Sequence, residues 1–427
     1  MTFSQTKKSP LAQVGLAIAS LALSALPVSL SLPVRAAENN LVATKQRART
    51  LEELRSGIKP RPNQPEPSAQ SQIPNEPAED PINIRPRVGT SNPMEVQPTR
   101  PSVPDWGPTI DPQMLAIIEQ LRAYEAPPYP ELTAAQAREA PNATSAVEGI
   151  LSKTGRPPIA PAVDIEHKLI PNPNGPEVLV RTYTPTRGNG PFPVIVYYHG
   201  GGWVIANLDT YETSAKELAT RTNAIVISVA YRQAPEHKFP AAHEDSFAVY
   251  EWATENVAEI GGDPTRIALA GESAGGNLAV AVALMAKERG VELPEHILSV
   301  YPIADGDTES SSYDQYANAF PLNRPLMEWF FGLYLNNPSE AENPLISLTS
   351  ADLSELPPTT IINAEIDPLR AEGENLAAQM EAAGVDVVQM TYPGVTHEFF
   401  GMSAILEQAV AAQEMAAERL RTAFGTE

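Results

Sequence analysis

The chain has 427 residues, of which 42% are hydrophobic and 19% charged, a composition that excludes a wholly disordered protein. Acidic residues outnumber basic ones by 52 to 30, giving a formal net charge of -22, so nucleic-acid partners are not expected, because phosphates would be repelled. The chain contains no cysteine, which excludes disulfides, thiolate nucleophiles and cysteine metal ligands.

The N-terminal segment has the pattern of a secretory signal. Lys7 and Lys8 precede an apolar run from Leu11 to Leu32, and small residues around Ala36 provide a cleavage position before Ala37. Residues 1–36 are therefore predicted to be a signal peptide, and the protein to be exported to the periplasm or the medium. The alternative is an uncleaved membrane anchor, since residues 11–32 are just long enough to span a bilayer.

A proline-rich segment follows. Fourteen of the 43 prolines fall between Pro60 and Pro112, with few large apolar residues among them. Proline has no amide donor, so residues 37–105 are predicted to be a disordered linker without a core of their own. Residues 1–105 carry a net charge of +3 and the remainder -25, so the acidity belongs to the globular part.

From Asp111 the pattern becomes that of folded elements. Met114, Leu115, Ile118 and Leu121 lie at helical spacing behind an Asp111-Pro112 cap, which predicts an amphipathic helix. Beyond Pro161, short apolar runs alternate with helical patterns. The expected strands are Val178–Tyr183, Val194–Tyr198, Ile225–Val229, Ile267–Ala270, Ile297–Tyr301, Thr359–Asn363 and Val385–Thr391. The expected helices are Ser214–Thr222, His243–Val257, Leu278–Arg289, Ala371–Ala383 and Ser403–Phe424. This alternation predicts an α/β fold, a mostly parallel twisted sheet with helices on both faces.

The segment Gly271-Glu272-Ser273-Ala274-Gly275 lies between a predicted strand and a predicted helix. A sharp strand-to-helix turn that presents a nucleophilic serine tolerates only small residues at its flanks, and this segment has them. Ser273 is therefore the expected nucleophile. The alternative is a glycine-rich turn in which Ser273 only caps the helix.

A serine needs a base and a group that orients the base. Only His296 and His397 follow Ser273 in the chain, and His296 lies at the start of a strand, so His397 is the expected base. Asp367, just after the strand Thr359–Asn363, is the expected orienting acid. Four other acidic residues remain as alternatives at this point: Asp305, Asp307, Glu365 and Glu372.

Three glycines, Gly200 to Gly202, follow the strand Val194–Tyr198. Such a loop brings backbone amides close to a ligand, and in a hydrolase sheet it supplies the oxyanion hole together with the residue after the nucleophile, here Ala274. His199 precedes the glycines and is expected to hold the loop rather than to act as a base.

These motifs together resemble the hormone-sensitive-lipase-like family of α/β-hydrolase esterases, over roughly Asp111 to Phe424. Four further segments carry the resemblance: Tyr231-Arg232-Gln233-Ala234-Pro235-Glu236, Phe239-Pro240-Ala241-Ala242, Gly262-Asp263-Pro264 and Asp367-Pro368-Leu369-Arg370. Gln233 stands where the family usually has leucine, and Glu272 where it more often has aspartate; neither change removes a catalytic group.

The resemblance implies a Ser273, Asp367 and His397 triad with an oxyanion hole formed by the amides of Gly200, Gly201 and Ala274. It also implies an N-terminal helical cap, here residues 106–156, with a contribution from Pro325–Leu335, over a catalytic domain of residues 157–427.

The expected function is hydrolysis of small carboxylic esters of short to medium acyl chain, without metal or cofactor. Trp203, Met114 and Ile118 are candidates for the apolar substrate pocket, as are Leu121, Tyr124, Phe320, Trp329 and Phe330, although each could equally be core. An amidase or peptidase with the same triad, and a non-catalytic ligand-binding homologue, are the alternatives. The sequence does not indicate the oligomeric state.

Overall fold

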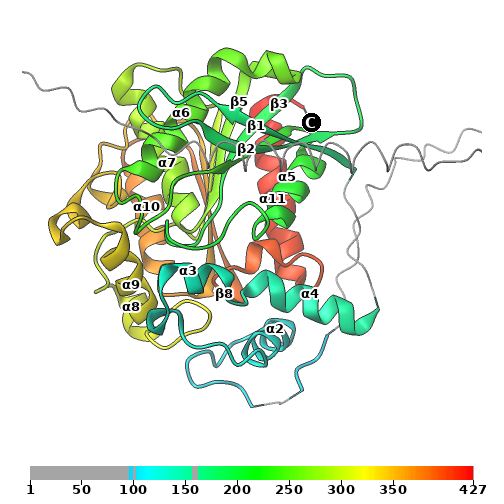
Figure 1. The fold of residues 1–427 in the computed structure, drawn as a ribbon, viewed down its shortest axis with the longest axis vertical. Coiled ribbons are helices and arrows are strands. Elements are labelled where there is room, and N and C mark those ends of the chain that lie inside the picture. Colours follow the sequence, from blue (N-terminus) through cyan, green and yellow to red (C-terminus); the bar gives the residue numbers. More distant parts are fainter. Residues whose placement is uncertain (1–95, 100–101, 156–161, 427) are drawn as a thin grey trace, which may run out of the picture. The chain divides into compact units, whose positions relative to one another are not determined.

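The computed structural model describes residues 96–99, 102–155 and 162–426. The predicted signal peptide and most of the predicted linker lie outside these residues. The described part contains an eight-stranded sheet in the order β1-β2-β4-β3-β5-β6-β7-β8 (Figure 1). Only the β1/β2 and β2/β4 pairs are antiparallel, so the prediction of an α/β fold with a mostly parallel sheet is confirmed. The strands are β1 Val163–Ile170, β2 Val178–Pro185, β3 Phe192–Tyr198, β4 Ile225–Ala230, β5 Gly262–Glu272, β6 His296–Val300, β7 Thr359–Ile366 and β8 Val387–Thr396.

All seven predicted strands are present, with ends shifted by a few residues. The sequence did not indicate β1, which pairs with β2 in an antiparallel hairpin. Most residues of β1 are exposed, so the strand has no apolar run to mark it. Its pairing with β2, rather than burial, fixes it in the sheet.

The central strand β3 shows how the two layers of core arise. All seven of its residues are buried, and successive side chains enter opposite layers: Val194 and Val196 pack on one side, Ile195 and Tyr197 on the other. Helices α6, α7 and α10 cover the first side, and α5 and α11 the second (Figure 1). Their bounds are α5 Glu212–Thr222, α6 Ala241–Asn256, α7 Ala274–Arg289, α10 Arg370–Ala382 and α11 Glu407–Phe424.

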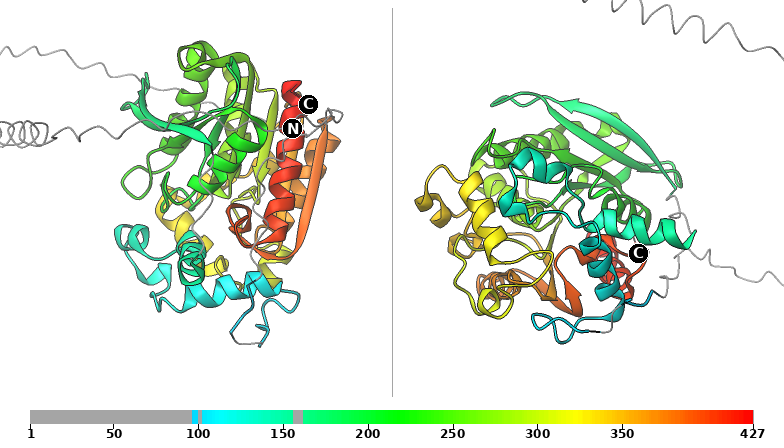
Figure 2. Two further views of the ribbon diagram at one scale, coloured as in Figure 1. Left: turned by 90° about the vertical axis from the view of Figure 1, so that its right-hand side faces the viewer. Right: turned by 60° about the horizontal axis from the view of Figure 1, so that its bottom comes forward.

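The residues before the sheet form a group of helices at one end of it (Figure 2, cyan). In α2 the Asp111 carboxylate accepts a hydrogen bond from the amide of Gln113 at 2.8 Å, which confirms the predicted cap and satisfies a free first-turn donor. The group comprises α2 Pro112–Arg122, η1 Tyr129–Glu131, α3 Ala134–Glu139 and α4 Ala143–Thr154.

The remaining described helices are α8 Ser311–Gln315, α9 Arg324–Tyr334, η2 Val257–Ile260, η3 Pro338–Glu342, η4 Leu348–Ser350 and η5 Phe399–Gly401. None of the helices in the described ranges has the length and apolar character needed to cross a membrane.

The start of α7 packs directly on the end of β3. A side chain at Gly275 would place its Cβ 1.9 Å from the carbonyl oxygen of Tyr198 and 2.6 Å from that of His199. Both neighbours are backbone atoms of the sheet, so they cannot move aside as a flexible side chain could. Glycine at this position is what allows the helix to approach the sheet closely.

We therefore expect Gly275→Ala to lower the free energy of unfolding by about 3 kcal/mol through steric overlap, measured by urea denaturation. Gly332→Ala is the matched control, because Gly332 lies exposed in α9 and its added Cβ meets nothing within 4 Å. That control should gain roughly 0.5–1 kcal/mol from helix propensity. Equal stabilities for the two variants would contradict the close approach of α7 to β3.

Candidate active site

Ser273 lies at a strained turn between β5 and α7. Its φ of 58° and ψ of -119° fall in a region that non-glycine residues rarely adopt. The backbone on both sides is held: the Ser273 amide donates to the Val300 carbonyl of β6 at 2.9 Å, and the Ser273 carbonyl accepts from Asn277 at 3.0 Å. The predicted strand–turn–helix setting of Ser273 is thus present, with the residue 5% exposed.

Sheet register brings Asp367 and His397 together. In the parallel pair of β7 and β8, Ile366 lies opposite Thr396, and the next residues along the two strands are Asp367 and His397. Asp367 Oδ2 lies 2.7 Å from His397 Nδ1, and both side chains are buried. Because a carboxylate can only accept, Nδ1 carries the proton, and Nε2 is the ring nitrogen left for another partner.

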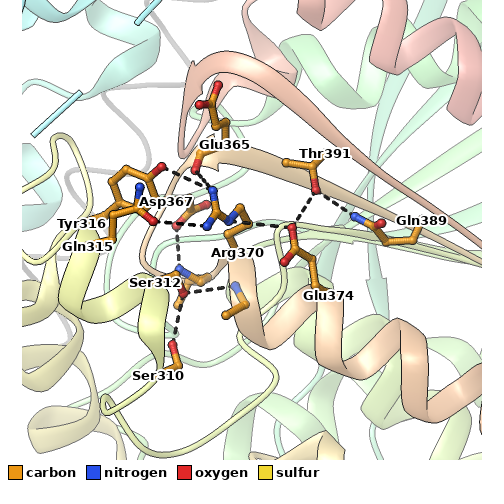
Figure 3. A network of polar contacts seen from close by, with 12 residues as sticks. Ser310, Ser312, Gln315, Tyr316, Glu365, Asp367, Arg370, Glu374, Gln389 and Thr391 are labelled. Carbon is orange, nitrogen blue, oxygen red and sulfur yellow. Dashed lines mark hydrogen bonds and ion pairs between the residues drawn. The ribbon is translucent and has the colours of Figure 1, made fainter. Parts of the chain in front are cut away.

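The turn that carries Asp367 is held by neighbouring elements (Figure 3). Asp367 Oδ1 accepts from the amide of Leu369 at 2.9 Å. The hydroxyl of Ser312 in α8 donates to the carbonyl of Pro368 at 2.6 Å. The Arg370 guanidinium reaches acceptors on Gln315, Tyr316 and the Glu365 backbone. The acid therefore has little freedom to rotate away from His397.

The four acidic alternatives to Asp367 are occupied elsewhere. Asp305 accepts from Ser347 and Thr349, and Asp307 from the amide of Glu309. Glu365 accepts from Thr109 and from the Gly394 amide, and Glu372 from two backbone amides. Of the five candidates, the structure places only Asp367 in hydrogen-bond contact with His397.

The charge around His397 favours its protonated form. Burial lowers the pKa of His397, but attraction to Asp367, their hydrogen bond and the charges of Glu398 and Glu272 outweigh burial and raise it above its ordinary value. The Tyr301 ring packs on the imidazole with centroids 4.5 Å apart. His397 is therefore a buried imidazole that takes up a proton readily.

The glycine loop after β3 is held in place by contacts to its backbone carbonyl oxygens. Tyr231 Oη donates to the His199 carbonyl at 2.8 Å, and His199 Nδ1 lies 2.8 Å from the Gly200 carbonyl. Burial lowers the pKa of His199 to about 4, so its ring is neutral and holds the loop. No hydrogen bond in the described part of the chain uses the amides of Gly200, Gly201 or Ala274 as donors, so these amides remain available to an oxygen.

A cavity of about 320 Å³ joins these groups, since Ser273, His397 and Gly201 all line it. Its apolar lining comes largely from the N-terminal helices, from the loops that connect them, and from residues 320–330 in and before α9. Leu121, Phe320 and Phe330, which the sequence suggested, are among its residues. Other contributors include Ala126, Pro128, Tyr129, Tyr211, Leu322, Leu326 and Glu398.

The expectation that Trp203, Met114 and Ile118 line this cavity is wrong. Met114 and Ile118 lie on the face of α2 that packs into the core. Trp203 is fully buried and stacks on Tyr334 with ring centroids 4.5 Å apart. Tyr124 and Trp329 do not line the cavity either. An apolar stripe on a helix indicates which face is buried, but it does not distinguish core from pocket.

Sequence reasoning missed the polar groups around His397. Glu272, beside the nucleophile, is buried and accepts hydrogen bonds from the hydroxyls of Tyr197 and Tyr301. Burial raises the pKa of Glu272 to about 7, although the two tyrosines lower it. Glu398 is a second, partly buried acidic group and accepts a hydrogen bond from Tyr211 Oη at 2.8 Å. The sequence did contain a signal for these groups, because an acidic residue stands next to Ser273 and another next to His397.

No cluster of three or more His, Asp or Glu side chains in the described ranges is arranged to hold a metal ion.

Comparison with known proteins agrees with this fold. A family described as having the alpha/beta hydrolase fold matches residues 195–401. Carboxylesterase NlhH of Mycobacterium tuberculosis is 38% identical over 260 residues, which are 60% of this chain and 82% of that protein. Ethyl acetate hydrolase of Pseudomonas putida is 33% identical over 252 residues, or 58% of this chain and 79% of that protein. Among solved structures, an esterase of Pyrobaculum calidifontis is similar at a TM-score of 0.67 and 36% identity, covering 73% of this chain and 98% of that one.

The raised pKa of Glu272 predicts a pH dependence of stability. A carboxyl group whose pKa is about 7 in the folded state and 4.5 otherwise contributes stability that is complete below pH 4.5 and is lost as the pH rises through 7. As the pH rises from 4.5 to 8, Glu272→Gln should therefore gain about 3 kcal/mol of stability relative to the unsubstituted protein, measured by urea denaturation. Glu381→Gln, an exposed position in α10, is the control, and the prediction fails if both variants show the same pH dependence.

Proposed function

The chain belongs to the hormone-sensitive-lipase-like family of α/β-hydrolase carboxylesterases, and we propose that it hydrolyses short- to medium-chain esters through Ser273, His397 and Asp367. The observation that carries the proposal is the shared cavity, which is lined both by a serine on a strained turn and by an imidazole whose Nδ1 is hydrogen-bonded to a buried carboxylate. This arrangement supports an acyl-enzyme mechanism.

In the proposed first step, Ser273 Oγ attacks the ester carbonyl carbon and its proton passes to Nε2 of His397. Asp367 holds the ring and stabilises the imidazolium that forms. The carbonyl oxygen becomes an oxyanion, which the amides of Gly200, Gly201 and Ala274 stabilise. Each donor of this kind typically contributes ~10²–10³ in rate.

In the second half, the intermediate collapses, the bond to the alcohol oxygen breaks, and His397 returns its proton to the departing alcohol. Water then attacks the acylated Ser273 while His397 accepts a proton from it. Breakdown of the second intermediate releases the acid and restores the serine hydroxyl. The residues described here suffice for every proton transfer in this sequence.

Replacement of Ser273 tests the mechanism directly. Ser273→Ala should lower kcat for p-nitrophenyl acetate by at least ~10⁴, because the nucleophile is absent, and should abolish labelling by a fluorophosphonate probe. Its melting temperature should stay within about 2 °C of the parent, because only one polar atom is removed. Ser350→Ala, at an exposed position in η4, is the control and should retain both activity and labelling. Peptide mapping of the label to another residue would contradict the assignment of Ser273.

The size and lining of the cavity support a preference for small acyl groups. It is about 320 Å³ and largely apolar, bounded by residues such as Leu121, Leu326 and Phe330. We expect kcat/KM for p-nitrophenyl esters to be highest for acyl chains of about two to eight carbons and to fall for palmitate, which the cavity cannot enclose. A matched series of acyl lengths measures this, and highest activity on palmitate would contradict it.

A further inference from the structure

Glu398, which directly follows His397, is a carboxylate in the lining of the active-site cavity. Its backbone has φ 74°, a left-handed conformation that a glutamate adopts only when its surroundings hold it there. The Oε1 atom accepts a hydrogen bond from Tyr211 Oη at 2.8 Å, and Tyr211 lines the same cavity. The side chain is thus held against the space where substrate binds.

No cation of the described residues forms an ion pair with this carboxylate. Two arginines line the cavity, Arg122 and Arg138. The Arg138 guanidinium donates hydrogen bonds to the Glu236 carboxylate and to two backbone carbonyls. Arg122 lies over aromatic rings, 5.0 Å from the centroid of Phe320. Burial raises the pKa of Glu398, although the charge of the neighbouring His397 and the Tyr211 hydrogen bond lower it. Ionising this carboxylate in a largely apolar cavity is therefore costly, and a bound cation would relieve that cost.

Aromatic rings surround the same space. Tyr129, Tyr211 and Phe330 line the cavity with Glu398. Burial raises the pKa of Tyr129 to about 12, and the negative charge of Glu398 adds to the rise. The Tyr129 hydroxyl is therefore close enough to Glu398 to interact with its charge. Aromatic rings together with a carboxylate are the kind of surroundings that bind quaternary ammonium groups.

The position of Glu398 beside His397 indicates which part of the substrate it meets. In the proposed mechanism His397 protonates the departing alcohol, so the alcohol oxygen must lie next to its ring. Since Glu398 follows His397 in the chain and lines the same cavity, we place it nearer the alcohol part of the substrate than the far end of the acyl chain.

We propose that Glu398, with Tyr129 and Tyr211, forms a subsite for a positively charged group on the alcohol part of the ester, so that the enzyme favours esters of amino alcohols over neutral esters of the same shape. This inference rests on the proposed ester hydrolysis. Glu398 acts here as a specificity-determining residue, which selects among substrates of one reaction.

The test compares acetylcholine with 3,3-dimethylbutyl acetate, which has the same shape without the charge, at pH 8. The ratio of kcat/KM for the charged over the neutral ester should fall about tenfold in Glu398→Gln, because the amide keeps an acceptor for Tyr211 but carries no charge. Tyr211→Phe removes the hydrogen bond to Glu398 but keeps the ring and the charge, so its ratio should fall less than that of Glu398→Gln. Glu381→Gln removes an equal charge from the exposed surface of α10 and should leave the ratio unchanged.

A second measurement does not require turnover of either ester. Choline and 3,3-dimethyl-1-butanol are compared as competitive inhibitors of p-nitrophenyl acetate hydrolysis, and choline should lose its advantage to the largest extent in Glu398→Gln. Equal loss of activity on both esters together with an unchanged inhibitor ratio would overturn the subsite and leave Glu398 a structural residue. Failure of the proposed function is a separate result, since Ser273→Ala would then still hydrolyse p-nitrophenyl acetate.

Discussion

The hydrogen bond between Asp367 and His397 is the contact on which the rest of the site depends. It places the imidazole proton on Nδ1, leaves Nε2 free, and raises the basicity of the ring against the effect of burial. The contact exists because β7 and β8 are adjacent and parallel, with Ile366 opposite Thr396. A shift of this register by one residue would turn one of the two side chains to the other face of the sheet and separate them. The chemistry therefore depends on strand pairing as much as on the residues themselves.

Several residues in the active site and in the loops next to it have strained backbone. Positive φ values occur at Ser273, Trp203, Tyr301 and Glu398. Each such conformation costs on the order of 1–3 kcal/mol of folding free energy. The packing and hydrogen bonds around these residues hold them in this backbone conformation. The Ser273 amide is bonded to Val300, the Trp203 ring is stacked and buried, and Tyr301 lies between Glu272 and His397. The central strands and α7, most of whose residues are buried, form the packed core that stabilises these conformations.

The sequence was informative where burial or backbone geometry constrains residue type. The buried strands gave apolar runs, and the turn at Ser273 required the small residues that flank it. It was uninformative where a residue's role depends on what faces it. The exposed strand β1 left no pattern, and Met114 and Ile118 looked like pocket residues because core and pocket select the same side chains. The pair of Tyr211 and Glu398 joins positions 187 residues apart, a proximity that only the folded chain reveals.

The distribution of acidic groups raises a physical difficulty that the structure resolves. Three acidic residues raise the pKa of His397: Asp367, Glu272 and Glu398. The proposed reaction nevertheless creates a further negative charge nearby, on the carbonyl oxygen of the substrate. Burial raises the pKa of Glu272 to about 7, which limits its charge at neutral pH although its two tyrosine donors favour the charged form. Asp367 lies on the Nδ1 side of the ring, away from Nε2. The amides of Gly200, Gly201 and Ala274 come from the ends of other strands. In the proposed reaction, the negative groups favour the imidazolium and the backbone donors favour the oxyanion, so each charge forms where it is stabilised.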